Sequence, residues 1–282
     1  MLSYLHAFHA GGWADVFKHA GLALLARGLQ KKPTPFAYLE THAGRGLYDL
    51  DAPAAQKTAE HQDGIVRLGL DRADAPRDLE PYLDAVRAEN QTQGLRFYPG
   101  SPRVVRHLLR PGDRMVLAEL HPREVPELKR LFARDPQVGV HAIDGYTMLK
   151  SFLPPREKRG LVFIDPSYEI KTEYDDAALA VIAARRRFPE GVFALWYPVL
   201  PASGWSRLLD AVCASGVRKV FRAELLLRPP STPDGLNGSG LLVVNPPWKW
   251  NEQIARLLPW LRVRLALASH KADAIAEWLV PE

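Results

Sequence analysis

Short apolar runs alternate with segments of helical periodicity along most of this chain. The runs are rich in Val, Leu, Ile and aromatic residues and are bounded by Gly, Pro or Asp, which is typical of β-strands. They predict strands at residues 36–41, 114–120, 138–144, 161–165, 192–199, 219–227 and 241–245.

The segments between these runs place apolar residues at helical spacing. They predict helices at residues 14–32, 101–110, 122–135, 175–188 and 205–216. Ser101 is the expected N-cap of the second helix, with Pro102 at its first helical position, and Gly216 is the expected C-cap of the last. Strands that alternate with helices predict an α/β fold, with a mostly parallel sheet covered on both faces.

Residues 51–98 interrupt this alternation, since they contain no convincing strand. The segments 58–70 and 79–91 have helical patterns, so we expect a helical insertion between the first and second strands. The chain is otherwise expected to form a single domain over residues 1–282. A helical insertion of this kind can form one wall of a substrate cleft, or it can serve only for packing.

Composition narrows the class of protein. The chain has 282 residues, 47% of them hydrophobic, and no run of eighteen apolar residues, so no transmembrane helix is expected. Cys213 is the only cysteine, so an intrachain disulfide is excluded. Since the N-terminus also lacks a secretory signal, we expect a cytoplasmic protein. A net charge of +5 suits a nucleic-acid partner, as do the clusters 156–160 and 185–187, but many enzymes are equally basic.

Acids and a glycine-rich turn follow four of the predicted strands. Gly44-Arg45-Gly46 comes after the first strand, Glu119 ends the second, Asp144 and Gly145 end the third, and Asp165 ends the fourth. Ligands of open α/β sheets bind outside the carboxyl ends of the strands. Each acid alone could be a surface group or a helix cap, but three acids and a glycine turn together at one edge of a sheet predict a binding site.

The glycine turn favours a nucleoside without a diphosphate as the ligand. Two glycines let a backbone approach a ligand closely, and Glu119 could accept both hydroxyls of a ribose. A full dinucleotide fingerprint would have a third glycine or alanine where this chain has Asp49, whose charge would repel a pyrophosphate. Asp144 could accept a hydrogen bond from the amino group of an adenine.

The stretch Asp165-Pro166-Ser167-Tyr168 resembles the signature of amino-methyltransferases that use S-adenosylmethionine, an acid or amide followed by Pro-Pro and an aromatic residue. The nitrogen of an adenine amino group is a poor nucleophile because its lone pair is delocalised into the ring. Hydrogen bonds from its N–H groups to the Asp165 carboxylate and the Pro166 carbonyl would free that lone pair. Tyr168 could stack on a flipped target base.

A closer resemblance covers nearly the whole chain. The blocks "MLSYLHAFHAGGWADVFKH", "YLETHAGRG", "YPGSP", "AELHP", "DGY", "FIDPSYEIKTEY", "ALWYPV" and "NPPW" are similar to the bacterial family that methylates N6 of an adenine in 23S ribosomal RNA. The resemblance implies a Rossmann-like class I methyltransferase fold with a seven-stranded sheet, S-adenosylmethionine as the cofactor and 23S ribosomal RNA as the partner. We also expect a monomer that binds no metal.

The resemblance implies roles for individual residues. It assigns Asp165, Pro166 and Tyr168 to catalysis and Tyr4 to contact with the RNA. The insertion would help to shape the RNA-binding face. The cofactor would be bound by Lys18, His19, His42, Ser101, Glu119, Asp144, Gly145 and Asp165.

Ser167 stands where the family signature has a second proline. The proposed acceptor is the Pro166 carbonyl, so we expect a looser loop with activity retained. Two alternatives remain open: a methyltransferase for DNA adenine N6 or guanine N2, and a non-catalytic RNA-binding protein with a decayed site. Ser167 is the only feature that favours the second of these.

Other candidate residues have simpler readings. His6, His9 and His19 occur without a cysteine cluster or an H-E-x-x-H motif and do not indicate a metal site. Cys213 fits a small buried apolar residue, and Trp196 either borders the target base or packs in the core.

The stretch Asn245-Pro246-Pro247-Trp248 matches the amino-methyltransferase signature better than the one at Asp165. The last strand of this fold class is inserted antiparallel, so we expect the stretch at the opposite edge of the sheet. There it would form a turn that packs Trp248.

Overall fold

A computed structural model of the chain describes residues 4–92, 94–201, 204–233, 235–266 and 272–282. Its centre is an eight-stranded sheet with the order β10-β8-β9-β7-β6-β1-β4-β5. The strands are β1 (Ala37–Glu40), β4 (Arg114–Ala118), β5 (Val138–His141), β6 (Gly160–Ile164), β7 (Val192–Val199), β8 (Val220–Leu226), β9 (Gly238–Val244) and β10 (Asp273–Val280). We call the edge where β1 and β4–β7 end the carboxyl edge, and the edge where they begin the amino edge.

The mostly parallel sheet that was predicted is confirmed. Strands β1 and β4–β7 pair in parallel, whereas β9 is antiparallel to both of its neighbours, β7 and β8. All seven predicted strands are present. The predicted count is nevertheless wrong by one, because β10 adds an eighth strand antiparallel to β8. This strand has a single neighbour and several exposed side chains, so its sequence lacks a continuous apolar run.

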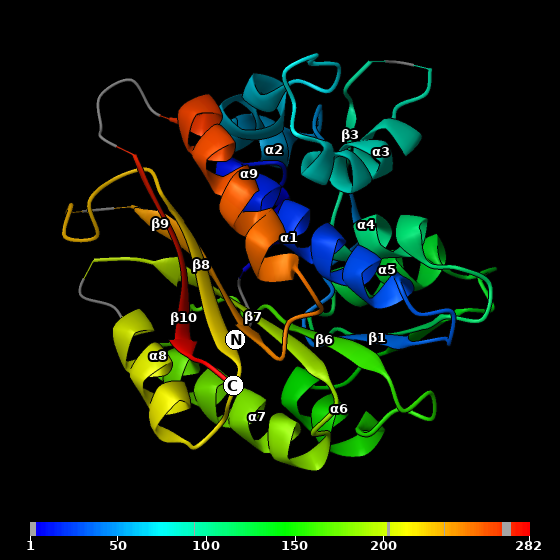
Figure 1. The fold of residues 1–282 in the computed structure, drawn as a ribbon. Coiled ribbons are helices and arrows are strands. Elements are labelled where there is room, and N and C mark those ends of the chain that lie inside the picture. Colours follow the sequence, from blue (N-terminus) through cyan, green and yellow to red (C-terminus); the bar gives the residue numbers. More distant parts are fainter. Residues whose placement is uncertain (1–3, 93, 202–203, 234, 267–271) are drawn as a thin grey trace.

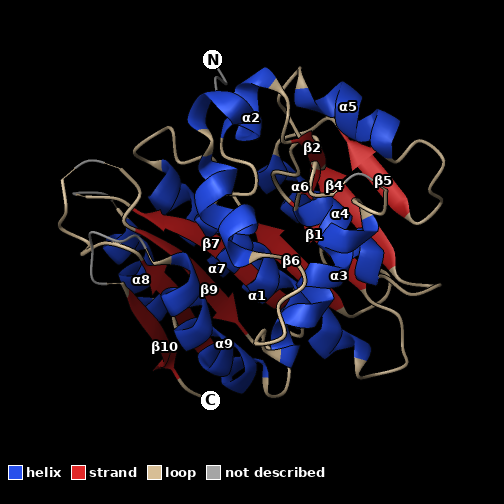
Figure 2. Cartoon of the chain, turned by 90° about the horizontal axis from the view of Figure 1, so that it is seen from above, coloured by secondary structure: helices blue, strands red, loops and turns tan. Residues whose placement is uncertain are grey.

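Helices cover both faces of the sheet (Figures 1 and 2). One face packs against α1 (Trp13–Gln30), α4 (Ser101–Leu108), α5 (Glu124–Leu131) and α9 (Trp250–Leu265). The other packs against α6 (Gly145–Phe152), α7 (Glu173–Arg187) and α8 (Trp205–Ala214). Buried apolar side chains form a separate cluster on each face. Helix α1 has twelve buried residues in a row, Asp15–Ala26, because it lies between the sheet and the helices outside it.

The segment at residues 51–98 lies over α1, at the top of Figure 1. A small antiparallel sheet of β2 (Leu47–Asp49) and β3 (Phe97–Pro99) closes its two ends. Between them lie α2 (Pro53–Thr58), a π-helical turn (Gln62–Val66), a 3-10 turn (Arg77–Leu79) and α3 (Glu80–Ala88). The expectation of no strand in this segment missed β3, which has three residues. Its central residue, Tyr98, is buried against α1, and its hydroxyl oxygen lies 3.1 Å from that of Tyr82, with which it forms a hydrogen bond.

The Asn245–Trp248 stretch follows β9 and therefore lies at the amino edge, as expected. The Asn245 amide donates to the carbonyl of Gly191, at the start of β7, over 3.2 Å. The expectation that Trp248 packs is wrong, because its side chain is 77% exposed. The buried position belongs to Trp250, whose indole donates to the Gly21 carbonyl of α1 over 3.1 Å.

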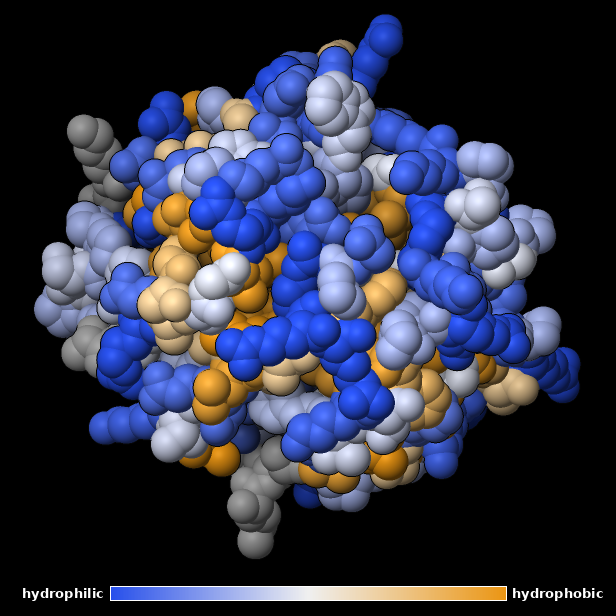
Figure 3. Space-filling view, turned by 60° about the horizontal axis from the view of Figure 1, so that its bottom comes forward, coloured by the Kyte–Doolittle hydropathy of each residue, from blue (hydrophilic) through white to orange (hydrophobic). Residues whose placement is uncertain are grey.

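Among the described helices, none is long and apolar enough to cross a membrane. Seen from the side of α6, α7 and α8, the surface is mainly hydrophilic, with apolar side chains scattered between the polar ones (Figure 3).

Candidate active site at the carboxyl edge

Four parallel strands deliver the predicted residues to the carboxyl edge. Glu40, the last residue of β1, pairs in register with Leu117 of β4 and Phe163 of β6, and Ala118 pairs with His141 of β5. These strands therefore end at about the same level along the strand direction, and the loops that follow them begin side by side. They carry Gly44, Glu119, Asp144 and Asp165.

Glu119 and the glycine turn form one hydrogen-bonded unit. The Glu119 carboxylate accepts from the backbone amides of Gly44 over 2.7 Å, Leu120 over 2.8 Å and His121 over 2.7 Å. Gly44 has a φ of 59°, and a Cβ there would lie 2.5 Å from the Tyr48 hydroxyl oxygen. The turn thus requires glycine, and it holds the carboxylate 9% exposed at the end of its strand.

Asp144 begins helix α6 and caps it. Its carboxylate accepts from the Thr147 amide over 2.7 Å, while the residue itself is exposed. Gly145 lies against β1's exit loop, because a Cβ there would be 2.3 Å from the Thr41 carbonyl oxygen. Glycine at this position therefore lets the start of α6 approach the loop that carries His42.

His42 lies between the groups predicted to bind a cofactor. Its Nδ1 is 2.8 Å from the Thr41 hydroxyl, and its ring meets that of Tyr146 edge-on at 5.6 Å. Burial lowers the pKa of His42 to about 4, although the charges of Asp165 and Asp144 oppose that shift. The imidazole is therefore neutral at pH 7.

Asp165 is paired with a buried lysine from the N-terminal helix. Lys18 Nζ lies 2.9 Å from Asp165 Oδ2 and 3.0 Å from Asp15 Oδ1. The Lys18 side chain is 4% exposed and that of Asp165 is 12% exposed. Burial alone would lower the pKa of Lys18, but the two carboxylates raise it above its usual value, so the ammonium stays charged.

Asp15 is a site residue that was not predicted from the sequence. Besides Lys18, its carboxylate accepts from His6 Nε2 over 2.8 Å and from the Gly11 amide over 3.0 Å. Burial opposes the ionisation of Asp15, but His6 and Lys18 hold its pKa well below the usual value. The available signal was an Asp and a Lys three residues apart in a mainly apolar stretch of the helix, a spacing that places both on one face.

The N-terminal segment continues this polar chain outward. The Tyr4 hydroxyl lies 2.9 Å from His6 Nδ1, and the Tyr4 ring stacks on His9 with 5.6 Å between centroids. Tyr4, His6, Asp15, Lys18 and Asp165 thus form a connected path from the N-terminal segment to the end of β6. Residues 1–3 of the predicted N-terminal block lie outside the described residues.

Aromatic rings surround the Asp165 loop. Tyr168 has a φ of 55°, is 9% exposed, and donates from its hydroxyl to the Trp196 carbonyl over 2.5 Å. Its ring packs against Tyr174 at 4.4 Å between centroids. The ring of Trp196 lies beside the buried ammonium, with Lys18 Nζ 4.9 Å from its centroid.

Two residues predicted to bind the cofactor are buried and form hydrogen bonds with other side chains of the protein. His19 is 1% exposed, its Nδ1 lies 2.8 Å from the Tyr98 hydroxyl, and burial lowers its pKa to about 3. The Ser101 hydroxyl donates to Glu40, whose pKa is raised by burial to about 8. The prediction that Ser101 caps α4 is wrong, because the N-cap is Gly100 and Ser101 is the first helical residue.

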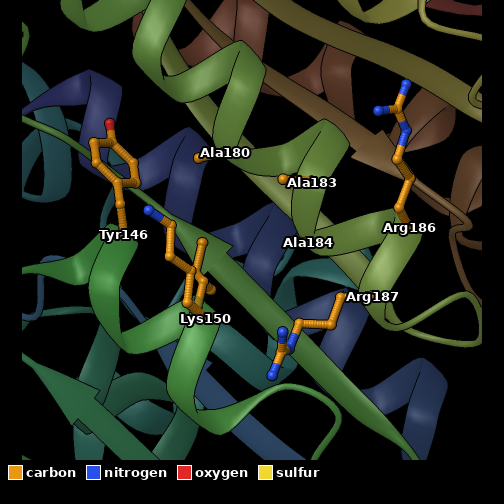
Figure 4. Close-up of a pocket in the computed structure, with 8 residues that line it drawn as sticks. Tyr146, Lys150, Ala180, Ala183, Ala184, Arg186 and Arg187 are labelled. Carbon is orange, nitrogen blue, oxygen red and sulfur yellow. The ribbon is translucent and has the colours of Figure 1, made fainter.

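A surface groove lies between α6 and α7 (Figure 4). It is lined by Tyr146, Leu149, Lys150, Ala180, Ala183, Ala184, Arg186 and Arg187. None of the predicted site residues is among them. Within the described part of the chain, no group of three His, Cys, Asp or Glu side chains is placed to hold a metal ion.

Comparison with known proteins gives one consistent result. A family model described as "Ribosomal RNA large subunit methyltransferase D, RlmJ" matches residues 33–280. Proteins named ribosomal RNA large subunit methyltransferase J are 43% identical in Escherichia coli and 41% identical in Haemophilus influenzae, over the full length of both chains in each case. The crystal structure of protein LPL1258 from Legionella pneumophila superposes with a TM-score of 0.88 at 37% identity, covering 96% of this chain and 98% of that one.

Proposed function

The chain belongs to the RlmJ family of ribosomal RNA large subunit methyltransferases, and we propose that it methylates N6 of an adenine in 23S ribosomal RNA with S-adenosylmethionine. The observation that carries the proposal is the Asp165 carboxylate, held by buried Lys18 at 2.9 Å on the edge that also carries Glu119 and Asp144. An anionic acceptor followed by the Pro166 carbonyl is what an exocyclic amine needs.

Glu119 and Asp144 would bind the nucleoside part of the cofactor. A carboxylate offers about four acceptor positions, and backbone amides fill three of those on Glu119, so about one remains on Oε2. We therefore propose that Glu119 accepts from one ribose hydroxyl rather than both. Asp144 retains the oxygen that does not cap α6 and would accept from the adenine amino group. The bound cofactor supplies an electrophilic methyl group on a sulfonium.

Asp165 and Pro166 would orient the target amine. Lys18 occupies Oδ2 of Asp165, which leaves Oδ1 and the Pro166 carbonyl to accept the two N–H groups. Both acceptors draw the nitrogen toward a tetrahedral geometry and align its lone pair for transfer. Since Lys18 stabilises the negative carboxylate, we propose that Asp165 positions the amine and that the proton released after transfer passes to water.

The N-terminal segment and the insertion would contact the RNA. Tyr4 lies at the outer end of the path that leads to Asp165, where it can meet a base that has left its stack. Tyr168 could stack on that base only if its ring left Tyr174 and its hydroxyl left the Trp196 carbonyl. Trp196, beside Lys18, is the other aromatic ring in position to border the base.

The test is methyl transfer from labelled S-adenosylmethionine to unmodified large-subunit ribosomal RNA, followed by nucleoside analysis. Labelled N6-methyladenosine is expected, with none in DNA and none on guanine. Asp165→Ala should abolish transfer and leave cofactor binding in place, whereas Asp176→Ala, at an exposed acid of α7, should change neither. Intact cofactor binding without labelled RNA would refute the proposal and favour a non-catalytic RNA-binding protein.

A further inference from the structure

A tryptophan is displayed on the edge of the sheet opposite the candidate active site. Trp248 is 77% exposed, the highest fraction among the large apolar side chains of the described residues. Burial of an indole is strongly favourable and tryptophan is enriched at interfaces, so a ring exposed to this extent is a candidate contact for a partner. Trp248 follows β9, and its backbone carbonyl lies beside the end of α1, within hydrogen-bonding distance of Lys31.

The turn that carries Trp248 is held firmly. Lys31 Nζ donates to the Trp248 carbonyl over 3.2 Å, and the Trp250 amide donates to the Pro247 carbonyl over 3.0 Å. Pro247 packs so closely on α1 that a Cβ on Gly28 would lie 2.6 Å from its own Cβ. Trp250 anchors the other side of the turn, because it is fully buried. The backbone that carries the exposed ring is thus fixed in position.

Positive charge surrounds this ring. Lys249 Nζ lies 5.9 Å from the centre of the indole, and Lys31 and Lys32 extend from the end of α1. Arg159 donates to the Leu29 carbonyl over 2.7 Å, which adds a guanidinium beside the same helix end. Further cations in loops of the amino edge are Arg110, Lys158 and Lys219.

The acids at this edge are largely neutralised. Asp113 is buried against Arg110, Glu157 is paired with Arg114, and Glu282 is paired with Lys219. Glu190, at the start of β7, and Glu252, in the first turn of α9, are exposed acids at this edge. Arg110 and Lys219 are matched by Asp113 and Glu282, but Lys31, Lys32, Lys158, Arg159 and Lys249 still outnumber the two exposed acids, so the balance of charge around Trp248 is positive.

We propose that this surface, formed by Trp248, Lys31, Lys32 and Lys249, binds a single-stranded segment of the RNA that is methylated at the carboxyl edge. The inference rests on the proposed function. An exposed ring on a rigid turn can stack on an unpaired base, and flanking lysines can neutralise the adjacent phosphates. The two edges are separated by at least the length of β6, whose five residues span about 16 Å. An RNA fragment too short to span this distance around the protein would not reach the second surface.

The test compares Trp248→Ala with the wild type on long, protein-free ribosomal RNA and on a short fragment around the methylated adenine. Base stacking of this kind predicts a KM for the long RNA that rises roughly tenfold, and up to about a hundredfold, with unchanged kcat and cofactor affinity. Trp248→Phe should retain most of the affinity. Leu179→Ala, at an apolar α7 side chain that is 65% exposed, is the matched control.

A second variant tests the charges. Lys32→Gln combined with Lys249→Gln should reduce the slope of log affinity against log salt by about 1.4, since each single-strand phosphate contact contributes about 0.7. A KM unchanged by Trp248→Ala, in an enzyme that methylates the long RNA, would overturn the inference. So would an effect seen only on ribosomal particles, which would indicate a protein partner. Failure of the wild type to methylate any RNA would instead count against the proposed function.

Discussion

Replacing Lys18 by Met tests the arrangement of charges in the site. The ammonium lies 3.0 Å from Asp15 and 2.9 Å from Asp165, with side-chain exposures of 4%, 4% and 12% for Lys18, Asp15 and Asp165. Methionine keeps most of the apolar volume, so little of the effect would come from a cavity. The change leaves two carboxylates close together without their shared cation. Breaking a buried pair in this way costs about 3–5 kcal/mol of unfolding free energy at neutral pH.

The pH dependence separates charge from packing. In the wild type the pKa of Lys18 is raised, so its stabilisation is present at neutral pH and is lost only as the pH rises through that value. The pKa of Asp15 is lowered, so its contribution is present above about pH 4 and is lost as the pH falls through the folded value. Between pH 5 and 8 both contributions are therefore constant in the wild type.

The variant should behave differently over the same range. Without the cation, burial raises the pKa of at least one carboxylate, so folding takes up a proton and the variant gains stability as the pH falls. Urea unfolding at pH 7.5 and pH 5.0 measures this. The deficit relative to the wild type should shrink by about 1–3 kcal/mol at the lower pH, at up to about 1.4 kcal/mol per pH unit for each proton.

The double variant Lys18→Met, Asp15→Asn is the control, because it removes one of the two carboxylates that shared the cation and should recover part of the loss. A deficit that is equal at both pH values, and that Asp15→Asn does not reduce, would refute the reasoning and assign the loss to packing.

Two further predictions concern cofactor binding and the catalytic loop. In Glu119→Gln, an NH2 group replaces one of the oxygens that now accept from backbone amides, which disrupts these hydrogen bonds. The Kd for S-adenosylmethionine, measured by calorimetry, should therefore rise about 10- to 100-fold, while RNA affinity stays unchanged. An unaltered Kd would exclude Glu119 from the cofactor site. Ser167→Pro should change the methylation rate by less than about tenfold, roughly 1.4 kcal/mol of barrier, because the acceptor is the carbonyl of Pro166, and a larger gain would mark serine as a defect in this loop.

The sheet and its functional edge were predictable because their signals are local. Each parallel strand is a short apolar run that ends in a polar residue, so Glu119, Asp144 and Asp165 could be placed at one edge from sequence order alone. The antiparallel insertion of β9 likewise assigned Asn245 to the opposite edge. Strand β10 escaped prediction because an edge strand with one neighbour needs no continuous apolar run.

The features that were missed depend on contacts between distant segments. Asp15 looked like an ordinary acid in the first turn of a helix, and only the fold shows that it shares Lys18 with Asp165. Ser101 has the sequence of an N-cap, but buried Glu40 takes its hydroxyl. Trp248 was expected to pack because indoles usually do, and Trp250 fills the buried position instead.

The link between Lys18 and Asp165 has a consequence for the order in which the protein can mature during synthesis. The two residues are 147 positions apart, so at about 5–20 residues per second Lys18 emerges roughly 7–30 s before its partner. The contact between Gly21 of helix α1 and Trp250 forms later still, because these residues are 229 positions apart. A nascent chain thus holds a charged and apolar helix without its final contacts until most of the polypeptide has been made. Catalytic competence should therefore appear late, and we expect chains that stop before α9 to depend on chaperones.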